Sequence, residues 1–268
     1  RTFSRKSSMP TPVVECAASS VEHPVSATNI ERYLDDMPNA VKLDEILSTI
    51  RSLVECESPS SDHVAVATSA DLVAELGERI LGAPAERIET NGVSHLRWRF
   101  GPNTKVLLLA HHDTVWPLGT LDRLPYAVND GVLTGPGCFD MKTGLAMAMH
   151  AIAALDLRDG VTLLVTGDEE LGSPNSRTLI EDTARQARAT LVLEASADGG
   201  ALKIERKGVS LYEVVLTGVA AHAGLEPENG VNTSIELAHQ VLAIESFANA
   251  DLGTSVTPTL AVSGTTSN

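Results

Sequence analysis

Three runs of consecutive apolar residues alternate with segments of helical periodicity in the middle of the chain. The apolar runs lie within residues 105–110, 161–166 and 190–193, and the helical segments between them cover residues 143–155 and 176–187. Short apolar runs of this kind are typical of strands that are buried on both faces of a sheet. The order strand, helix, strand, helix, strand therefore predicts an α/β domain with a mainly parallel sheet and flanking helices.

Two helices and a weak strand pattern precede the first apolar run. Apolar residues recur at helical spacing over residues 43–53, and Asp62 is the expected N-cap of a helix that continues to Leu81. Residues 96–100 alternate weakly between apolar and polar types, which predicts an edge strand. Residues 1–40 are rich in Ser, Pro, Thr and Ala without periodicity, so we expect a flexible lead-in.

The pattern changes near residues 199–200. Residues 201–206 and 210–217 have the pattern of antiparallel strands, residues 231–247 that of a long helix, and residues 255–262 that of another strand. We therefore expect a second, smaller α+β domain after the α/β domain. The predicted division is a lead-in over residues 1–40, an α/β domain over 41–198 and the smaller domain over 199–268.

Composition narrows the classes of function. The 268 residues include 20 Lys and Arg against 35 Asp and Glu, a formal net charge of −15. That balance argues against nucleic acid as a partner, because binding to a phosphate backbone depends on clustered Lys and Arg. No stretch approaches the ~20 consecutive apolar residues of a membrane span, so no membrane partner is expected. Three cysteines at unrelated spacings predict no disulfide framework, which favours a reducing, cytoplasmic location.

Polar residues collect where the buried strands are predicted to stop. His111 ends the first strand, Glu169 and Glu170 follow the second, and Glu194 follows the third, while Asp140 lies in a turn that opens a helix. Ligands of parallel sheets bind beyond the carboxyl ends of the strands, so these side chains are expected at one edge. One imidazole with several carboxylates suits zinc, with cobalt or manganese as substitutes.

The spacing of these residues suggests separate roles. Asp113 lies two residues after His111 on an extended segment, so both side chains leave the same face and Asp113 can hold the second imidazole nitrogen. Glu169 and Glu170 can belong to the same site only if they lie just past the end of the strand. One would then bind the metal ion, and the other would be positioned over a water molecule. Two alternatives stay open: Asp140 as a helix N-cap, and His112 as the ligand in place of His111.

Four segments have His, Asp, Glu and Gly at spacings that form sequence motifs. Residues 111–115 match H-x-D-T-V, residues 135–142 match G-x-G-x-x-D-x-K, residues 168–173 match D-E-E-x-G-S, and residues 218–232 match G-x-x-x-H-A-G-x-x-P-x-x-G-x-N. Together they resemble the zinc-dependent aminoacylase and carboxypeptidase metallopeptidase family, which includes glutamate carboxypeptidase, acetylornithine deacetylase and succinyl-diaminopimelate desuccinylase. The resemblance implies a zinc exopeptidase-like fold with a smaller dimerisation or lid domain, and hence a homodimer.

The resemblance also implies a dinuclear zinc site in the 41–198 domain. Asp140 would bridge the ions, with His111 and Glu194 on one and Glu170 on the other. Glu169 would be the general base for a zinc-bound hydroxide, and Asp113 would orient His111. The bond between Asp140 and Met141 would be cis.

Two residues of the smaller domain are implied to bind substrate, namely His222 and Asn268. By the same resemblance the chain is C-terminally truncated, because the rest of that domain and a second His ligand would follow Asn268.

The implied activity is hydrolysis of the amide bond of an N-acyl amino acid or short peptide, in the manner of glutamate carboxypeptidase. One alternative is an N-acetyl or N-succinyl amino acid deacylase. Another is an inactive metal-binding fragment, because the second His ligand is missing.

Overall fold

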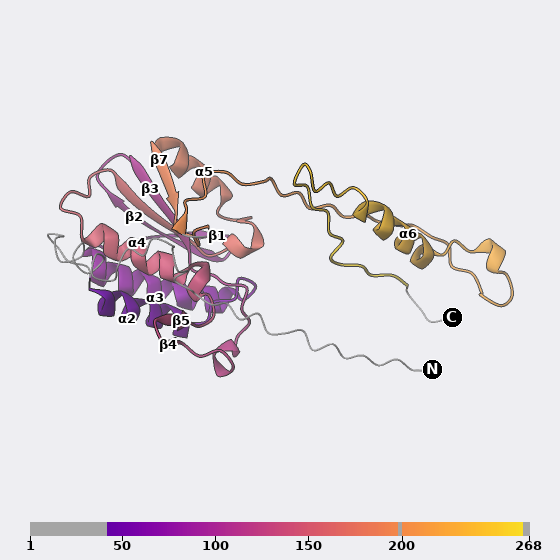
Figure 1. Ribbon diagram of the computed structural model, residues 1–268, viewed down its shortest axis with the longest axis horizontal. Helices are drawn as coiled ribbons and strands as arrows, with labels where there is room; N and C mark the ends of the chain where they lie inside the picture. The colour runs from indigo at the N-terminus through magenta and orange to yellow at the C-terminus, as the bar shows by residue number, and fades with distance from the viewer. Residues whose placement is uncertain (1–41, 198–199, 265–268) are drawn as a thin grey trace. The chain divides into compact units, whose positions relative to one another are not determined.

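The computed structural model describes residues 42–197 and 200–264, which divide into two compact units (Figure 1). One unit ends at Ile204 and the other begins at Glu205. The predicted lead-in over residues 1–40 lies outside the described residues.

The first unit is built on a five-stranded sheet with the strand order β1-β2-β6-β3-β7. Strand β3 pairs in parallel with β6 on one side and with β7 on the other, whereas the pairs β1–β2 and β2–β6 are antiparallel. The sheet is therefore mixed, and the prediction of a mainly parallel sheet is wrong. The strands are β1 (Glu86–Thr90), β2 (Val93–Phe100), β3 (Val106–His111), β6 (Val161–Thr166) and β7 (Ala189–Val192).

A tight hairpin explains the antiparallel half of the sheet. Asn91 and Gly92 join β1 to β2 with φ values of 50° and 81°, and two positive φ angles in a two-residue loop are the mark of a type I′ hairpin turn. Strand β2 then lies between β1 and β6, so the prediction that residues 96–100 form an edge strand is also wrong. The alternation there is weak because β2 is buried along most of its length.

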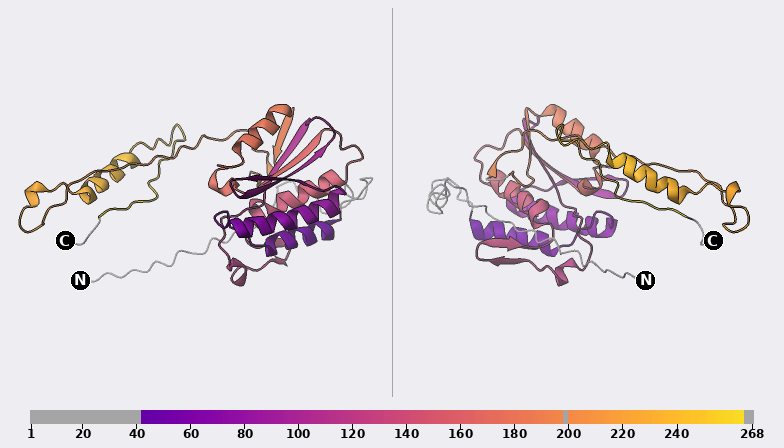
Figure 2. Two further views of the ribbon diagram at one scale, coloured as in Figure 1. Left: turned by 180° about the vertical axis from the view of Figure 1, so that it is seen from behind. Right: turned by 45° about the vertical axis from the view of Figure 1, so that its right-hand side comes forward.

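Helices cover both faces of this sheet. Helices α2 (Leu43–Glu55), α3 (His63–Leu81) and α4 (Thr143–Ala153) pack together on one face, and α5 (Arg177–Gln186) lies on the other (Figures 1 and 2). Asp62 caps α3 as predicted, with its carboxylate accepting two main-chain N–H groups at 3.0 Å. The apolar core lies between the three-helix face and the sheet.

A small two-stranded sheet lies outside these layers. Its strands, β4 (Ala127–Asn129) and β5 (Val132–Thr134), form an antiparallel pair that the hydropathy pattern did not predict. None of the helices in residues 42–197 and 200–264 is long and apolar enough to cross a bilayer.

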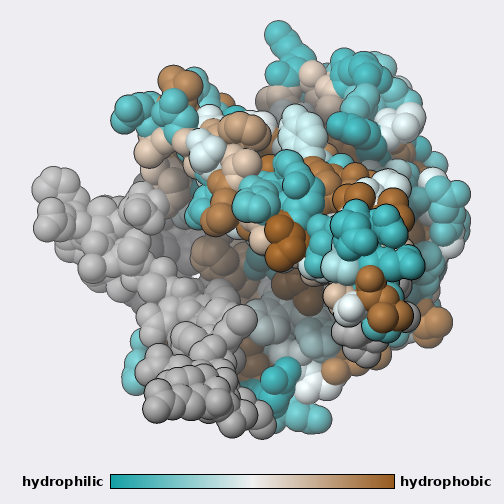
Figure 3. All heavy atoms as spheres, turned by 90° about the vertical axis from the view of Figure 1, so that its right-hand side faces the viewer, coloured by the Kyte–Doolittle hydropathy of each residue, from teal (hydrophilic) through white to brown (hydrophobic). Residues whose placement is uncertain are grey.

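The second unit contains the helix α6 (Thr233–Glu245), which begins at the N-cap Asn232. The strands predicted over residues 201–206, 210–217 and 255–262 do not form. In and near these ranges the described chain has only isolated β-bridges. A strand is stable only beside a hydrogen-bonded neighbour and a buried face, and no described residue after Glu205 is buried. Many apolar side chains of this unit are exposed, and apolar residues stand among hydrophilic ones on the face drawn in Figure 3.

Candidate metal centre

Acidic and imidazole side chains from four segments meet at one edge of the sheet. Strand β3 ends at His111, the 3₁₀ turn η3 (Glu169–Leu171) follows β6, and Glu194 follows β7. The fourth segment is the helical turn η2 (Cys138–Lys142), which contains Asp140 and leads into α4. Because β6, β3 and β7 are parallel, their carboxyl ends lie at the same edge, where such sheets bind ligands.

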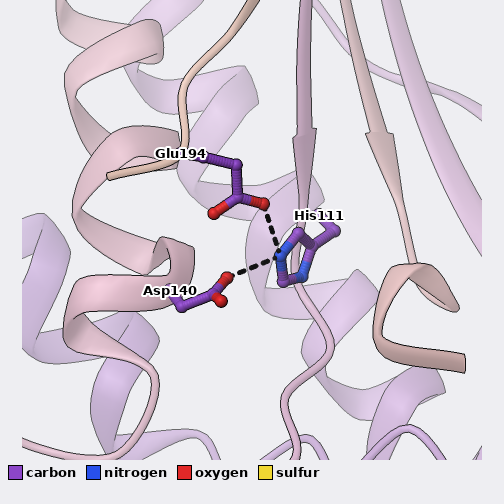
Figure 4. Close-up of side chains that lie close together, drawn as sticks. All are labelled: His111, Asp140 and Glu194. Carbon is purple, nitrogen blue, oxygen red and sulfur yellow. Dashed lines mark hydrogen bonds and ion pairs between the residues drawn. The ribbon is translucent and has the colours of Figure 1, made fainter. Parts of the chain in front are cut away.

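Two of these side chains converge on one nitrogen atom of a third, His111. His111 Nε2 lies 3.0 Å from Asp140 Oδ1 and 3.2 Å from Glu194 Oε1 (Figure 4). One ligand atom from each residue lies within 4.8 Å of the other two. His111 is 1% exposed, whereas the carboxylate of Asp140 is more than half exposed, so the cluster opens to solvent on the carboxylate side.

Close packing at the start of α4 brings the carboxylates together. A Cβ atom at Gly144, in the first turn of α4, would overlap the main-chain oxygen of Leu193. Only glycine allows this close approach. The approach places the segment that carries Asp140 near Glu194. The peptide bond between Asp140 and Met141 is cis, as the resemblance implies.

The other nitrogen of His111 faces an acceptor. His111 Nδ1 lies 2.9 Å from the main-chain oxygen of Asp113 and 3.4 Å from its carboxylate Oδ1. A carbonyl oxygen only accepts, so Nδ1 carries the hydrogen and donates it, which leaves the lone pair of neutral His111 on Nε2. That lone pair is directed at the oxygens of Asp140 and Glu194, so three electron-rich atoms face one another.

Such a cluster favours a bound cation, either a proton or a metal ion. Burial alone would lower the pKa of His111, but hydrogen bonds to Asp113, Asp140 and Glu194 raise it to about 12. A bound proton is thus strongly favoured where a metal ion would otherwise lie. Zinc holds its nitrogen and oxygen ligands tetrahedrally at about 2.0–2.1 Å, which separates them by roughly 3.3 Å. The 3.0 and 3.2 Å separations fit that requirement, and the donor set of one imidazole and two carboxylates suits zinc.

Glu169 and Glu170 lie beside this cluster. Glu169 Oε2 is 3.9 Å from His111 Nε2. Glu170 and Asp140 line a cavity of about 300 Å³ whose other walls include Trp116 and Phe139. Burial raises the pKa of both glutamates, and the charge of Asp140 helps to raise that of Glu170 to about 7. Both carboxyl groups can therefore hold a proton more readily than a solvated glutamate.

Two buried aspartates hold the turn that carries these glutamates. The carboxylate of Asp113 accepts the main-chain N–H groups of Glu169 and Glu170, each at 3.2 Å. The carboxylate of Asp168 accepts the N–H of Asn175 at 2.6 Å and both the N–H and the hydroxyl of Ser176. Sequence reasoning assigned no role to Asp168; its position at the end of a buried strand was the available signal.

A comparison with protein-family models identifies residues 107–266 with Peptidase family M20/M25/M40. The chain belongs to this family. The matched range contains the cluster of His111, Asp140 and Glu194 together with Glu169 and Glu170.

Two curated relatives illustrate the similarity within the M20 family. Carboxypeptidase G2 of Pseudomonas sp. strain RS-16 is 31% identical over 261 residues, which cover 91% of this chain and 62% of that protein. Succinyl-diaminopimelate desuccinylase 2 of Shewanella loihica is 35% identical over 191 residues, covering 64% of this chain and 50% of that protein. The chain thus spans less than two thirds of the length of either relative.

Two solved peptidase structures share the fold. The M20 family metallo-carboxypeptidase Sso-CP2 of Sulfolobus solfataricus matches with a TM-score of 0.51 and 24% identity, covering 59% of this chain and 39% of that chain. The aminopeptidase PepT of Bacillus cereus matches with a TM-score of 0.51 and 20% identity, covering 75% of this chain and 56% of that chain. At these identities the likeness concerns the fold alone.

His112 is turned away from His111, Asp140 and Glu194 and into the core. Its Nδ1 lies 3.1 Å from the hydroxyl of Ser69, and its Nε2 lies 3.2 Å from the main-chain oxygen of Ser94. Both nitrogens therefore have partners inside the fold. Among these neighbouring histidines it is His111 that the structure brings to Asp140 and Glu194.

Acid is expected to destabilise the fold through His112. Burial lowers the pKa of His112 to about 4, whereas the unfolded value is about 6.5. The unfolded chain therefore binds this proton first, and stability is lost as the pH falls from about 6.5 to about 4, by up to roughly 3 kcal/mol. The measurement is the free energy of unfolding against pH for the unchanged chain and for His112→Gln. A difference between the two that does not change over this range would contradict the prediction.

The two substrate-binding residues predicted for the second unit have no observed role. His222 is exposed, and its Nδ1 accepts the main-chain N–H of Gly224 at 3.1 Å. Asn268 lies outside the described residues. Substrate contact by His222, and a homodimer formed through this unit, remain predictions.

Proposed function

We propose that this chain carries the catalytic centre of an M20 amide hydrolase that acts on N-acyl amino acids or short peptides. The observation that carries the proposal is the convergence of the Asp140 and Glu194 carboxylates on Nε2 of the buried His111, with Glu169 at 3.9 Å from the same atom. A cation site beside a carboxyl group with a raised pKa is what metal-assisted hydrolysis needs.

The described residues fit a metal centre that prefers zinc and accepts Co²⁺ or Mn²⁺. His111, Asp140 and Glu194 would hold one ion, and Asp140 with Glu170 would hold a second. Bound metal would polarise the scissile carbonyl and lower the pKa of a water molecule. The lone pair on His111 Nε2, fixed by the carbonyl of Asp113 at Nδ1, supports this assignment.

Glu169 would move the proton. Its carboxylate would accept a proton from the attacking water and return it to the nitrogen of the leaving amine. The pKa of Glu169 is raised by burial and by the charge of Glu194, so the protonated form is accessible during the reaction. Asp113 would act indirectly, by orienting His111 and by holding the main chain of Glu169.

Two substrate classes remain in competition. A glutamate carboxypeptidase-like activity is favoured by the 91% of this chain that aligns with carboxypeptidase G2. An N-acetyl or N-succinyl amino acid deacylase is favoured by the 35% identity to a succinyl-diaminopimelate desuccinylase. Both activities would cleave an amide bond by the same chemistry. Their substrates differ in the groups on either side of that bond.

The decisive test is metal content per folded chain together with hydrolysis of a substrate panel. The panel contains N-acyl-glutamates, short peptides ending in Glu, and N-acetyl and N-succinyl amino acids. We expect at least one bound Zn²⁺, Co²⁺ or Mn²⁺ per chain and hydrolysis that a chelator abolishes and added metal restores. Bound metal without hydrolysis would favour the inactive metal-binding alternative, and no bound metal would contradict the proposal.

A further inference from the structure

The turn between α2 and α3 is attached to the chain just beyond β3. Pro59 forms a parallel bridge with Thr114. On either side of it, Thr114 donates its N–H to the main-chain oxygen of Ser58 at 2.8 Å, and Ser60 donates its N–H to the main-chain oxygen of Thr114 at 3.1 Å. This attachment continues the hydrogen bonding of the sheet past His111. It also brings the hydroxyl groups of Ser58 and Ser60 next to residues 112 and 113.

The hydroxyl of Ser60 reaches the carboxylate of Asp113. Ser60 Oγ lies 2.6 Å from Asp113 Oδ2 and 3.2 Å from the main-chain oxygen of Thr114. The hydroxyl group has one hydrogen to donate. The carboxylate is the better acceptor for it, because that contact is shorter and charge-assisted. Ser60 is 5% exposed and Asp113 is 1% exposed, so water does not compete for this bond.

The Asp113 carboxylate connects three segments of the site. Besides Ser60, it accepts the main-chain N–H groups of Glu169 and Glu170 at 3.2 Å and lies 3.4 Å from His111 Nδ1. The contact with Ser60 is the shortest of the four. Rotation of the carboxylate would therefore disturb the imidazole and the turn that carries both glutamates together.

We propose that Ser60 is a positioning residue of the metal centre, which acts through Asp113 on His111 and on the main chain of Glu169 and Glu170. The inference rests on the metal centre proposed above and adds a residue from a different segment to it. The sequence pattern gave no sign of this role, because the partner of Ser60 lies 53 positions away in the chain.

Ser58 provides a matched control for Ser60. It lies in the same turn, is fully buried, and donates its hydroxyl at the same 2.6 Å, but to the main-chain oxygen of His112 and not to Asp113. Ser58→Ala and Ser60→Ala therefore each remove one buried hydrogen bond of equal length. They differ in whether the bond ends on the carboxylate that supports the metal site.

The experiment is titration of the full chain with Co²⁺, whose visible absorption depends on its ligands and their geometry. We expect Ser60→Ala to bind Co²⁺ about tenfold more weakly and with an altered spectrum, as is usual when a ligand's supporting group is lost. Ser60→Thr keeps the hydroxyl and is expected to restore the spectrum. Ser58→Ala is expected to keep both the affinity and the spectrum, and thermal unfolding of each variant checks that it is folded.

The outcomes separate this inference from the proposed function. A Ser60→Ala protein that binds Co²⁺ with unchanged affinity and spectrum would overturn the role of Ser60 and leave the metal centre intact. Equal changes in Ser58→Ala and Ser60→Ala would overturn it too, because the effect would then come from the turn as a whole. If the unchanged chain binds no Co²⁺, both the metal centre and the role of Ser60 fail.

Discussion

Replacing Glu169 by glutamine is expected to slow amide hydrolysis by about 10²–10⁴-fold, the usual contribution of a general base. Glutamine has nearly the same shape but cannot accept the proton of water. The main-chain bond from residue 169 to Asp113 does not involve the side chain, so the turn stays in position. Bound metal per chain is expected to stay unchanged, because Glu169 does not belong to the group of His111, Asp140 and Glu194 that could hold the ion. The measurements are kcat and metal content on the best substrate of the panel.

Glu181 offers a control for this substitution. Its side chain is 48% exposed, close to the 46% of Glu169, but it lies on α5 in ion pairs with Arg177 and Arg185. Glu181→Gln is expected to leave kcat unchanged. A Glu169→Gln protein that retains its rate would remove Glu169 from the mechanism, and a parallel loss of metal would instead make it a ligand.

Replacing His111 by alanine is expected to weaken metal binding by more than about 100-fold. Loss of a group that only supports a ligand already weakens binding by 10–100-fold, and His111 is itself the central donor of the cluster. The carboxylates of Asp140 and Glu194 would remain, but without the nitrogen they both approach at 3.0 and 3.2 Å. The measurement is the Zn²⁺ dissociation constant by competition with a chelator of known affinity.

His239 is the control for the histidine substitution, because it is an exposed residue of α6 in the second unit. His239→Ala is expected to bind Zn²⁺ as the unchanged chain does. If His111→Ala also retains full affinity, the ion is bound elsewhere. If both variants lose affinity for Zn²⁺, binding depends on the number of histidines in general and not on the cluster at the end of β3.

Much of the candidate site was predictable because its residues lie at or just after the ends of strands that apolar runs mark. Strand β7 is exposed along its length, so the prediction that residues 190–193 form a strand buried on both faces is wrong. Hydrophobic runs located β3, β6 and β7. His111 is the last residue of β3, Glu169 follows β6 after two intervening residues, and Glu194 follows β7 after one. The choice between His111 and His112 was not predictable from the pattern. The two are adjacent and chemically identical, and only packing against Ser69 and Ser94 turns His112 into the core.

The arrangement of the sheet was predictable only in part. The β-α-β order fixed the parallel pairing of β3 with β6 and β7. The antiparallel half depends on the hairpin at Asn91 and Gly92 and on the pairing of β2 with β6, whose partners are far apart in the chain. In the second unit, alternating residues predicted strands that the described chain does not form, because alternation favours a strand only where a partner pairs with it.

By itself the sequence determined which residue types gather at the carboxyl edge, since hydropathy marks where each strand ends and parallel strands end together. The tertiary structure alone decided which atoms meet: Nε2 of His111 with two carboxylates, and the carboxylate of Asp113 with Ser60 and the turn at Glu169. Strand ends are local properties of the chain. These contacts depend on the packing of segments 29 to 83 residues apart, which no local pattern specifies.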